Sequence, residues 1–266
     1  MCAAAPACRQ LATRHHEGEG GVMRHALSPR KWALRSPAAT RDALVLLLAF
    51  TAGCVDATSY LGLGRVFTAN MTGNTVLLGL SIAQAQWLAA LRSAVALAGY
   101  LTGVAGGTLL IGRTPKYGLW PPVVTTVCAL ECLILAAVAL AGALLASPPA
   151  NGTVDVLIVL TAAAMGLQGV GAGALGIRGV ATTYITGTWT SMMAGLVSRI
   201  PSAEQARAEP SLGTGLQAAV VGVYLLAAVV GGAAATRWHL IAFTVPIVVV
   251  AAVVTIAWLR FHRRNE

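Results

Sequence analysis

The sequence predicts an all-α protein that crosses a membrane several times, and three observations lead to this fold class. The chain of 266 residues is 57% hydrophobic and only 10% charged, with a mean hydropathy of +0.75. Soluble domains carry roughly 25% charged residues, so this chain has too few polar side chains to cover a surface in water. Its apolar residues gather into segments of bilayer-spanning length, and two of these segments resemble each other.

Eight apolar segments follow one another along the chain. They cover roughly residues 43–63, 66–85, 88–112, 121–146, 154–177, 180–198, 213–235 and 239–259. Six are long and apolar enough to span a bilayer as helices, but the second and sixth are rich in Asn, Thr and Gly. Such polar side chains face another helix or a cavity rather than lipid. We therefore expect six spanning helices and two polar segments that are broken or re-entrant, with eight spans as the alternative.

The two polar segments are related by a shift of 114 residues. When Leu61–Asn74 is compared with Leu175–Thr188, six of the 14 positions are identical without a gap. The apolar segments on either side also correspond in order, which indicates a duplication. The Ser-Pro-Pro-Ala-Asn stretch at residues 147–151 is typical of a linker. The predicted repeats therefore cover residues 42–148 and 149–260.

The basic residues are concentrated at the two ends of the chain. Residues 1–41 carry seven Arg or Lys against two Glu, and the last seven residues carry three Arg against one Glu. Positive charge is retained on the cytoplasmic side of membranes, so both termini are expected in the cytoplasm of a bacterial cell, with the protein in its inner membrane. Eight Arg or Lys residues lie in the loops between the apolar segments. Six spans would place five of them on the cytoplasmic side, whereas eight spans would place three there.

The two tails, residues 1–41 and 261–266, hold little that a core could bury. We expect the first to be disordered, and Met23 is an alternative start of the protein. The first apolar run begins near Ala43 behind a tail that is too long and basic for an ordinary signal peptide, so no cleaved leader is expected. Nucleic-acid binding would need a basic folded face with interleaved aromatic residues, and we expect no such partner.

Two carboxylates, Asp56 and Glu131, lie well inside apolar segments. A charge at the bilayer centre costs about 3 kcal/mol on insertion scales, so such residues are usually kept for a purpose. Three readings stay open: proton or cation coupling, a neutral carboxyl bonded to a neighbouring helix, or an ion pair with Arg65, Arg92 or Arg178.

Two polar runs carry the most specific local signal. Gly weakens a helix, and Asn and Thr can bind the backbone groups that a break leaves free; in transporters built from repeats, such breaks mark the binding site. Close helix packing through small residues is the structural alternative. The candidate pathway residues, besides Asp56 and Glu131, are Asn70, Thr72, Gly73, Asn74, Gln168, Thr183, Tyr184, Thr186 and Gly187.

Catalytic chemistry has little support in the sequence. No Ser/His/Asp set falls in the membrane region, and the glycines after Gln168 lack the Lys-Ser/Thr of a phosphate loop. Cys54, Cys128 and Cys132 lie in apolar segments and are interpreted as packing residues rather than as ligands. We expect no enzyme activity, no cofactor and no metal site.

The motif Ala52–Ala57 and the run Phe67–Thr75 resemble the YoaK-like family of bacterial membrane proteins of unknown function. Met165–Gln168 and Thr182–Thr188 resemble that family's other hallmark. The resemblance covers residues 42–259 and implies a multi-span protein of the bacterial inner membrane, without supplying a substrate.

The sequence departs from this family at Gly171–Gly176. A more polar stretch containing arginine is expected there, and only Arg178 remains. A role for a positive cluster at this place is therefore not carried over.

The function that these residues favour is a secondary transporter or permease for an unidentified small molecule, with proton or cation coupling. The alternative is a membrane scaffold or sensor that does not transport. The expected partners are the lipid bilayer and the small-molecule substrate, and a homo-oligomer is left open.

Overall fold

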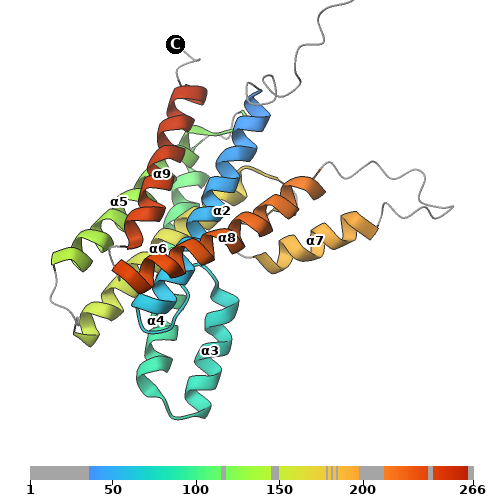
Figure 1. Cartoon of the computed structure of the whole chain (residues 1–266). Coiled ribbons are helices and arrows are strands. Elements are labelled where there is room, and N and C mark those ends of the chain that lie inside the picture. Colours follow the sequence, from blue (N-terminus) through green and yellow to red (C-terminus); the bar gives the residue numbers. More distant parts are fainter. Residues whose placement is uncertain are drawn as a thin grey trace, which may run out of the picture.

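The computed structural model describes residues 36–114, 118–144, 150–177, 179–180, 182–183, 185–197, 213–238 and 242–262. All regular structure in these residues is helical (Figure 1), which confirms the predicted all-α class. Six helices are long and apolar enough to cross a membrane, judged by length and composition. They are α2 (Pro37–Gly62), α4 (Trp87–Gly112), α5 (Pro122–Leu144), α6 (Asn151–Ala174), α8 (Thr214–Trp238) and α9 (Thr244–Ala257), which continues as η2 (Trp258–His262).

Two further helices are too short to span. These helices, α3 (Met71–Ala83) and α7 (Ile185–Val197), have 13 residues each, which corresponds to about 20 Å of helix against a hydrocarbon core of roughly 30 Å. Irregular backbone precedes each of them, at residues 63–70 before α3 and at the described residues 175–177, 179–180 and 182–183 before α7. The prediction of six spans and two broken polar segments is therefore confirmed. The breaks lie just before the Thr-Gly pairs Thr72-Gly73 and Thr186-Gly187.

Capping residues, rather than hydropathy, set where α2 and α3 begin. The hydroxyl of Ser36 accepts a hydrogen bond from the amide of Ala39 at 3.1 Å, and Pro37 occupies the first turn, as helix starts favour. The helix α2 thus begins six residues before the apolar run that predicted it, inside the predicted tail. The side chain of Asn70 caps α3 by accepting from the amide of Gly73 at 3.2 Å.

The two halves of the chain interleave. The first helix of each half packs most extensively on the third helix of the other, so that α2 lies against α8 and α6 lies against α4. Figure 1 shows α8 crossing α2 near the middle of the bundle. The helices α5 and α9 complete the bundle, because α5 packs on α6 and α9, and α9 packs on α2.

Glycine permits both crossings. A Cβ added at Gly53 would lie 2.4 Å from the carbonyl oxygen of Tyr224, and one added at Gly166 would lie 2.3 Å from the carbonyl oxygen of Tyr100. Lipid provides no hydrophobic drive for helix association, so membrane helices rely on such close backbone approach. Glycines that make similar approaches are Gly231 at the first crossing and Gly99 and Gly103 at the second.

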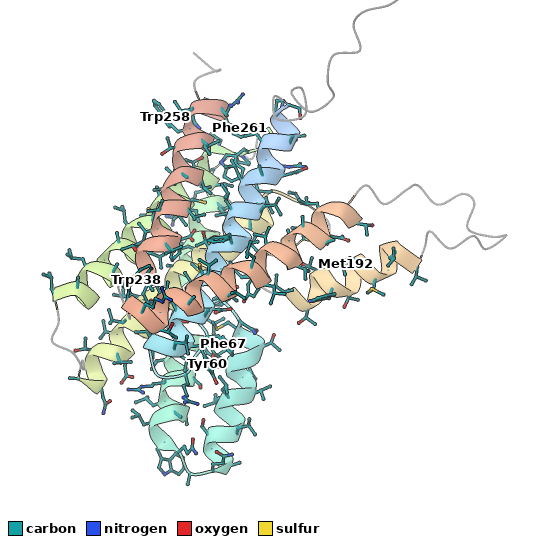
Figure 2. The ribbon with its side chains drawn as sticks, viewed as in Figure 1. Tyr60, Phe67, Met192, Trp238, Trp258 and Phe261 are labelled. Carbon is teal, nitrogen blue, oxygen red and sulfur yellow. The ribbon has the colours of Figure 1, made fainter. Side chains whose placement is uncertain are left out.

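The short helices lie outside the bundle. The helix α3 packs on α4 and α7 packs on α8, and each pair projects from the body of the molecule in its own direction (Figure 1). The outer side chains are largely apolar, including Trp238 and Trp258 near helix ends (Figure 2), both about half exposed. Aromatic residues at span ends are typical of membrane interfaces.

Candidate functional site

The first break is organised around a buried carboxyl group. Asp56, in the last part of α2, is 3% exposed. Its Oδ1 accepts hydrogen bonds from the backbone amides of Thr68 at 2.9 Å, Ala69 at 2.7 Å and Asn70 at 3.3 Å. These amides belong to irregular backbone and have no helical partner, so Asp56 supplies the acceptor that the break would otherwise lack.

The other carboxyl oxygen of Asp56 binds the opposite half of the chain. The hydroxyl of Tyr224 in α8 donates to Oδ2 at 2.5 Å. Ser59 donates to the carbonyl of Asp56 and accepts from the hydroxyl of Thr68, at 3.1 and 3.2 Å. Four donors thus hold the Asp56 side chain in place, and it joins α2, the first break and α8.

The polar side chains of α3 also stabilise the break. The amide group of Asn74 bonds both backbone groups of Phe67, accepting from its N–H at 3.0 Å and donating to its carbonyl at 2.5 Å. The Phe67 ring stacks on Tyr60 with centroids 5.0 Å apart (Figure 2). Gly73 faces that ring, since an added Cβ would lie 2.9 Å from it. Thr72 is exposed on the outer side of α3 and does not face the interior.

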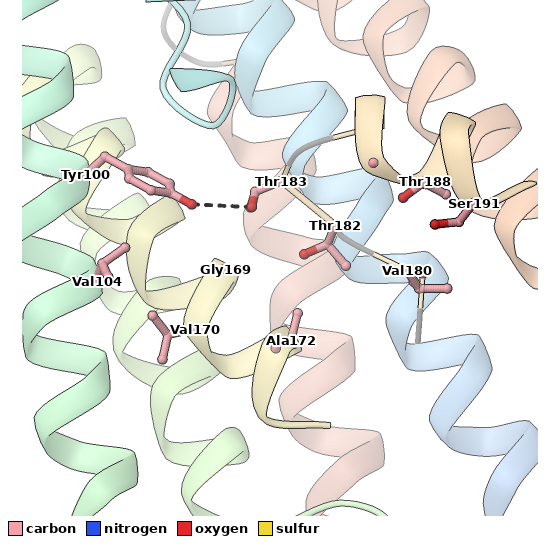
Figure 3. Close-up of a pocket in the computed structure, with 13 residues that line it drawn as sticks. Tyr100, Val104, Gly169, Val170, Ala172, Val180, Thr182, Thr183, Thr188 and Ser191 are labelled. Atoms are coloured by element: carbon pink, nitrogen blue, oxygen red, sulfur yellow. Dashed lines mark hydrogen bonds between the residues drawn. The ribbon is translucent and has the colours of Figure 1, made fainter. Parts of the chain in front are cut away.

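The second break borders a cavity of about 470 Å³ (Figure 3). Its walls come from α4, α6, the break and the first turns of α7. Of the predicted residues, Thr183 and Gly187 line this cavity, whereas Thr186 is exposed on α7 and Tyr184 lies outside the described residues. Ligand cavities in proteins are commonly roughly 300–1,000 Å³, so the space suits a small molecule.

Hydroxyl groups provide the polar part of the cavity. The hydroxyls of Tyr100 and Thr183 lie 3.4 Å apart, as Figure 3 shows. Thr182 is 1% exposed, and its hydroxyl has no hydrogen-bond partner among the described residues. Thr188 and Ser191 of α7 line the same space. Val104, Val170 and Val180 form an apolar part of the wall.

Two predicted residues lie away from the cavity. Gln168 is fully buried in α6 and donates to the carbonyl of Leu48 in α2 at 2.9 Å, which is the interhelical bond that a single Gln in a span often makes. Glu131 is fully buried in α5 next to Cys128 and Cys132, and neither of its carboxyl oxygens has a hydrogen-bond partner in the described structure.

No ion pair between described residues reaches either intramembrane carboxylate. Arg92 instead lies 3.5 Å from Asp155, and Arg41 pairs with its neighbour Asp42. The proposed pairing with Arg178 lies outside the described residues. Likewise, the described part of the chain contains no group of three or more His, Cys, Asp or Glu that could hold a metal ion.

Two tyrosines of the site were not predicted from the sequence. Tyr100 and Tyr224 each stand in an apolar span and reach the break that belongs to the other half of the chain. A single tyrosine inside a span is a weak signal, because its ring packs like any apolar side chain while its hydroxyl needs a partner. The need of a buried hydroxyl for a hydrogen-bond partner could have identified both tyrosines as candidate site residues from the sequence.

The six apolar spans, the two broken short helices and the buried polar groups between them define a multi-span α-helical membrane protein. The chain belongs to the family described as "Protein of unknown function (DUF1275)", whose model matches residues 44–257. It is 37% identical over 223 residues to the UPF0700 transmembrane protein YoaK of Bacillus subtilis (strain 168), covering 84% of this chain and 96% of that protein. The resemblance seen in the sequence is thereby confirmed. No solved structure matches the chain.

Proposed function

We propose that the protein is a secondary transporter or permease and that its small-molecule substrate binds in the cavity beside the second break. The cavity carries this proposal, because it combines a broken polar helix, clustered hydroxyls and an apolar wall among the spanning helices. Transporters built from repeats place their substrate sites at such discontinuous helices.

A duplicated architecture supports the proposal. The starts of α2 and α6, Pro37 and Asn151, are 114 residues apart, and so are the starts of α3 and α7, Met71 and Ile185. This is the shift that relates the two polar runs in the sequence. Three spans in each half would make the repeats inverted in the membrane, an arrangement that supports alternating access. Both termini would then lie on one side, which the basic tails place in the cytoplasm of a bacterium.

Glu131 is the better candidate for proton or cation coupling. Four donors hold the Asp56 side chain, which stabilises the first break. In the part of the chain that the structure describes, neither oxygen of the buried Glu131 has a hydrogen-bond partner, and an isolated intramembrane carboxyl is costly unless it serves a function. We therefore assign coupling to Glu131 and a structural role to Asp56.

A scaffold or sensor is the competing function. The projecting helices favour it, because Trp189, Met193 and Leu196 expose a row of apolar side chains on α7. Lipid would cover the same side chains in a transporter, so this surface alone does not separate the two functions.

Filling the cavity separates them. Gly173 lines the cavity, and an added Cβ there would meet nothing within 4 Å, so Gly173→Leu should occupy the space without displacing the backbone. Gly222 on α8 is equally open but lies outside the cavity, which makes Gly222→Leu the matched control. A deletion strain complemented with each variant is profiled for metabolite uptake and efflux. If the protein is a transporter, the deletion should change the metabolite profile, and the wild type and Gly222→Leu should restore it whereas Gly173→Leu should not. Equal restoration by both variants would favour the scaffold.

A further inference from the structure

The described residues of the two breaks share two features, a residue of positive φ and the position at which the next helix begins, so that one break can be compared with the other by position. With the shift of 114 residues, Arg65 corresponds to Gly179, and both have a positive φ, of 63° and 69°. The helices that follow the breaks begin at corresponding residues, Met71 and Ile185. A side chain that the first break uses therefore has a defined counterpart in the second.

The second break lacks the carboxyl group that organises the first. The counterpart of Asp56 is Val170, and the counterpart of Ser59 is Gly173; both counterparts line the cavity. Where the first half of the chain places a carboxylate and a hydroxyl, the second half thus has an apolar side chain and an open glycine. The cavity occupies the place that these two polar side chains fill in the first half.

A threonine hydroxyl that is bonded in the first break loses that partner in the second. Thr68 donates its hydroxyl to Ser59 in the first break, whereas the hydroxyl of its counterpart Thr182 is buried and has no partner among the residues that the structure describes. Figure 3 shows this hydroxyl directed toward the space between the break and α6. A buried hydroxyl without a partner costs roughly 1–3 kcal/mol, and a ligand that accepts its hydrogen bond would remove this cost.

Tyr100 has the place in the second crossing that Tyr224 has in the first. The backbone carbonyl of each tyrosine lies against a glycine of the crossing helix, Gly166 for Tyr100 and Gly53 for Tyr224. Tyr224 donates its hydroxyl to the Asp56 carboxyl group. The hydroxyl of Tyr100 lies 3.4 Å from that of Thr183 and lines the cavity, where it is positioned to donate to a ligand.

The electrostatic setting also favours an anion. Gly187 and Thr188, in the first turn of α7, line the cavity, and the N-terminus of a helix carries partial positive charge and attracts anions. None of the described lining residues is charged, so no fixed anion competes. Val104, Val170 and Val180 would contact an apolar body attached to the anionic group.

We infer that the cavity binds a small molecule with a short apolar body through its carboxylate, which takes the place that the Asp56 side chain fills in the first half. This inference rests on the proposed function, because it names the substrate class of the same cavity. Its test measures stability and binding rather than flux, so the inferred ligand class and the proposed transport function can fail separately.

A carboxylate supplied by the protein itself provides the first test. Val170→Asp places the counterpart of Asp56 in the second half, and Val104→Asp places a carboxylate on α4, away from Thr182 in Figure 3. In purified full-length protein in detergent, Val170→Asp should melt within about 3 °C of wild type, because the hydroxyls receive the new group. Val104→Asp should melt roughly 10 °C lower. Equal losses in the two variants, including failure of both to insert, would overturn the inference.

Thr182→Val then shows whether this hydroxyl receives the carboxylate. In the wild type, removing an unpartnered buried hydroxyl should leave the melting temperature unchanged or raise it. In the Val170→Asp background the same substitution should lower it by roughly 5 °C, and in the Val104→Asp background it should have no such effect. Equal effects of Thr182→Val in all three backgrounds would contradict the assignment, since contacting groups must show coupling.

Binding of free carboxylates is the last test. Butyrate and hexanoate should raise the melting temperature of the wild-type protein, their neutral amides should not, and Val170→Asp should abolish the response because its own carboxyl group fills the place. No response to the carboxylates, an equal response to the amides, or a response that survives in Val170→Asp would overturn the inference. If the carboxylates bind but the metabolite profile of the Gly173→Leu strain equals that of the wild type, the ligand class is supported and the transport function is not.

Discussion

The hydroxyl of Tyr224 donates a hydrogen bond to Oδ2 of Asp56, and the two residues stand 168 positions apart in the chain. This bond fastens α8, from the second half, to the end of α2, from the first. The other oxygen of Asp56 binds the backbone amides of the first break. A single carboxyl group therefore connects helix packing with the conformation of the irregular segment, and its removal should affect both.

Asp56→Ala should destabilise the protein strongly. The change leaves three backbone amides and the Tyr224 hydroxyl without their acceptor, and each unsatisfied buried group costs roughly 1–3 kcal/mol. We expect a loss of at least about 3 kcal/mol, seen as a lower melting temperature in detergent. Asp56→Asn should lose less, because its oxygen can still accept from the amides. An Asp56→Ala protein that melts like the wild type would exclude the structural role.

Glu131→Gln should insert and fold normally but abolish accumulation of substrate against its gradient. The amide has nearly the size of the carboxyl group but cannot gain and lose a proton, which coupling requires. The measurement is flux driven by a proton or sodium gradient in proteoliposomes, with the substrate taken from metabolite profiling. Asp56→Asn at matched protein level is the control and should retain more flux. If Glu131→Gln transports as well as the wild type, coupling does not depend on this residue.

Gly53→Ala should separate α2 from α8. Its added Cβ would lie 2.4 Å from the carbonyl oxygen of Tyr224, a contact that the backbone must relieve by moving. We expect a loss of roughly 2–3 kcal/mol in stability and a lower yield of monodisperse protein. Gly222→Ala on α8 meets nothing within 4 Å and should be neutral or stabilising by up to about 1 kcal/mol. Similar behaviour of the two variants would show that the crossing tolerates a methyl group.

A reporter enzyme that is active only in the periplasm should give no signal when it is fused after Glu266. The basic residues near the end of the chain are expected to stay in the cytoplasm. The same reporter placed after Ala85, between α3 and α4, tests the connection between a short helix and a span. With six spans and a cytoplasmic N-terminus, α3 and this connection lie toward the periplasmic side and should give a signal. A strong signal from the fusion at the C-terminus would contradict the prediction that this end of the chain lies in the cytoplasm.

The sequence predicted the elements of this fold better than the roles of its polar residues. Low charge and apolar segments indicated the six spans, and the polar runs indicated the two broken segments, because these properties are local. The roles of Asn70 and Asn74 were less accessible, since both side chains bind backbone within their own segment. Gln168 was predicted as a pathway residue, whereas in the structure it makes a bond between helices to the carbonyl of Leu48.

By itself the sequence determined that the protein lies in a lipid bilayer and where its six apolar spans run, and it indicated the shift that relates the two polar runs. Hydropathy over about 20 residues is a property of each segment alone, and a shift of 114 residues can be read without coordinates. Only the tertiary structure decided which polar groups are satisfied. Tyr224 reaches Asp56 because the first helix of one half packs on the third helix of the other. The hydroxyl of Thr182 has no partner among the described residues, because Gly173 stands where the hydroxyl of its counterpart Thr68 meets Ser59. Hydrogen bonds depend on distances between residues far apart in the chain, and the packing of helices sets those distances.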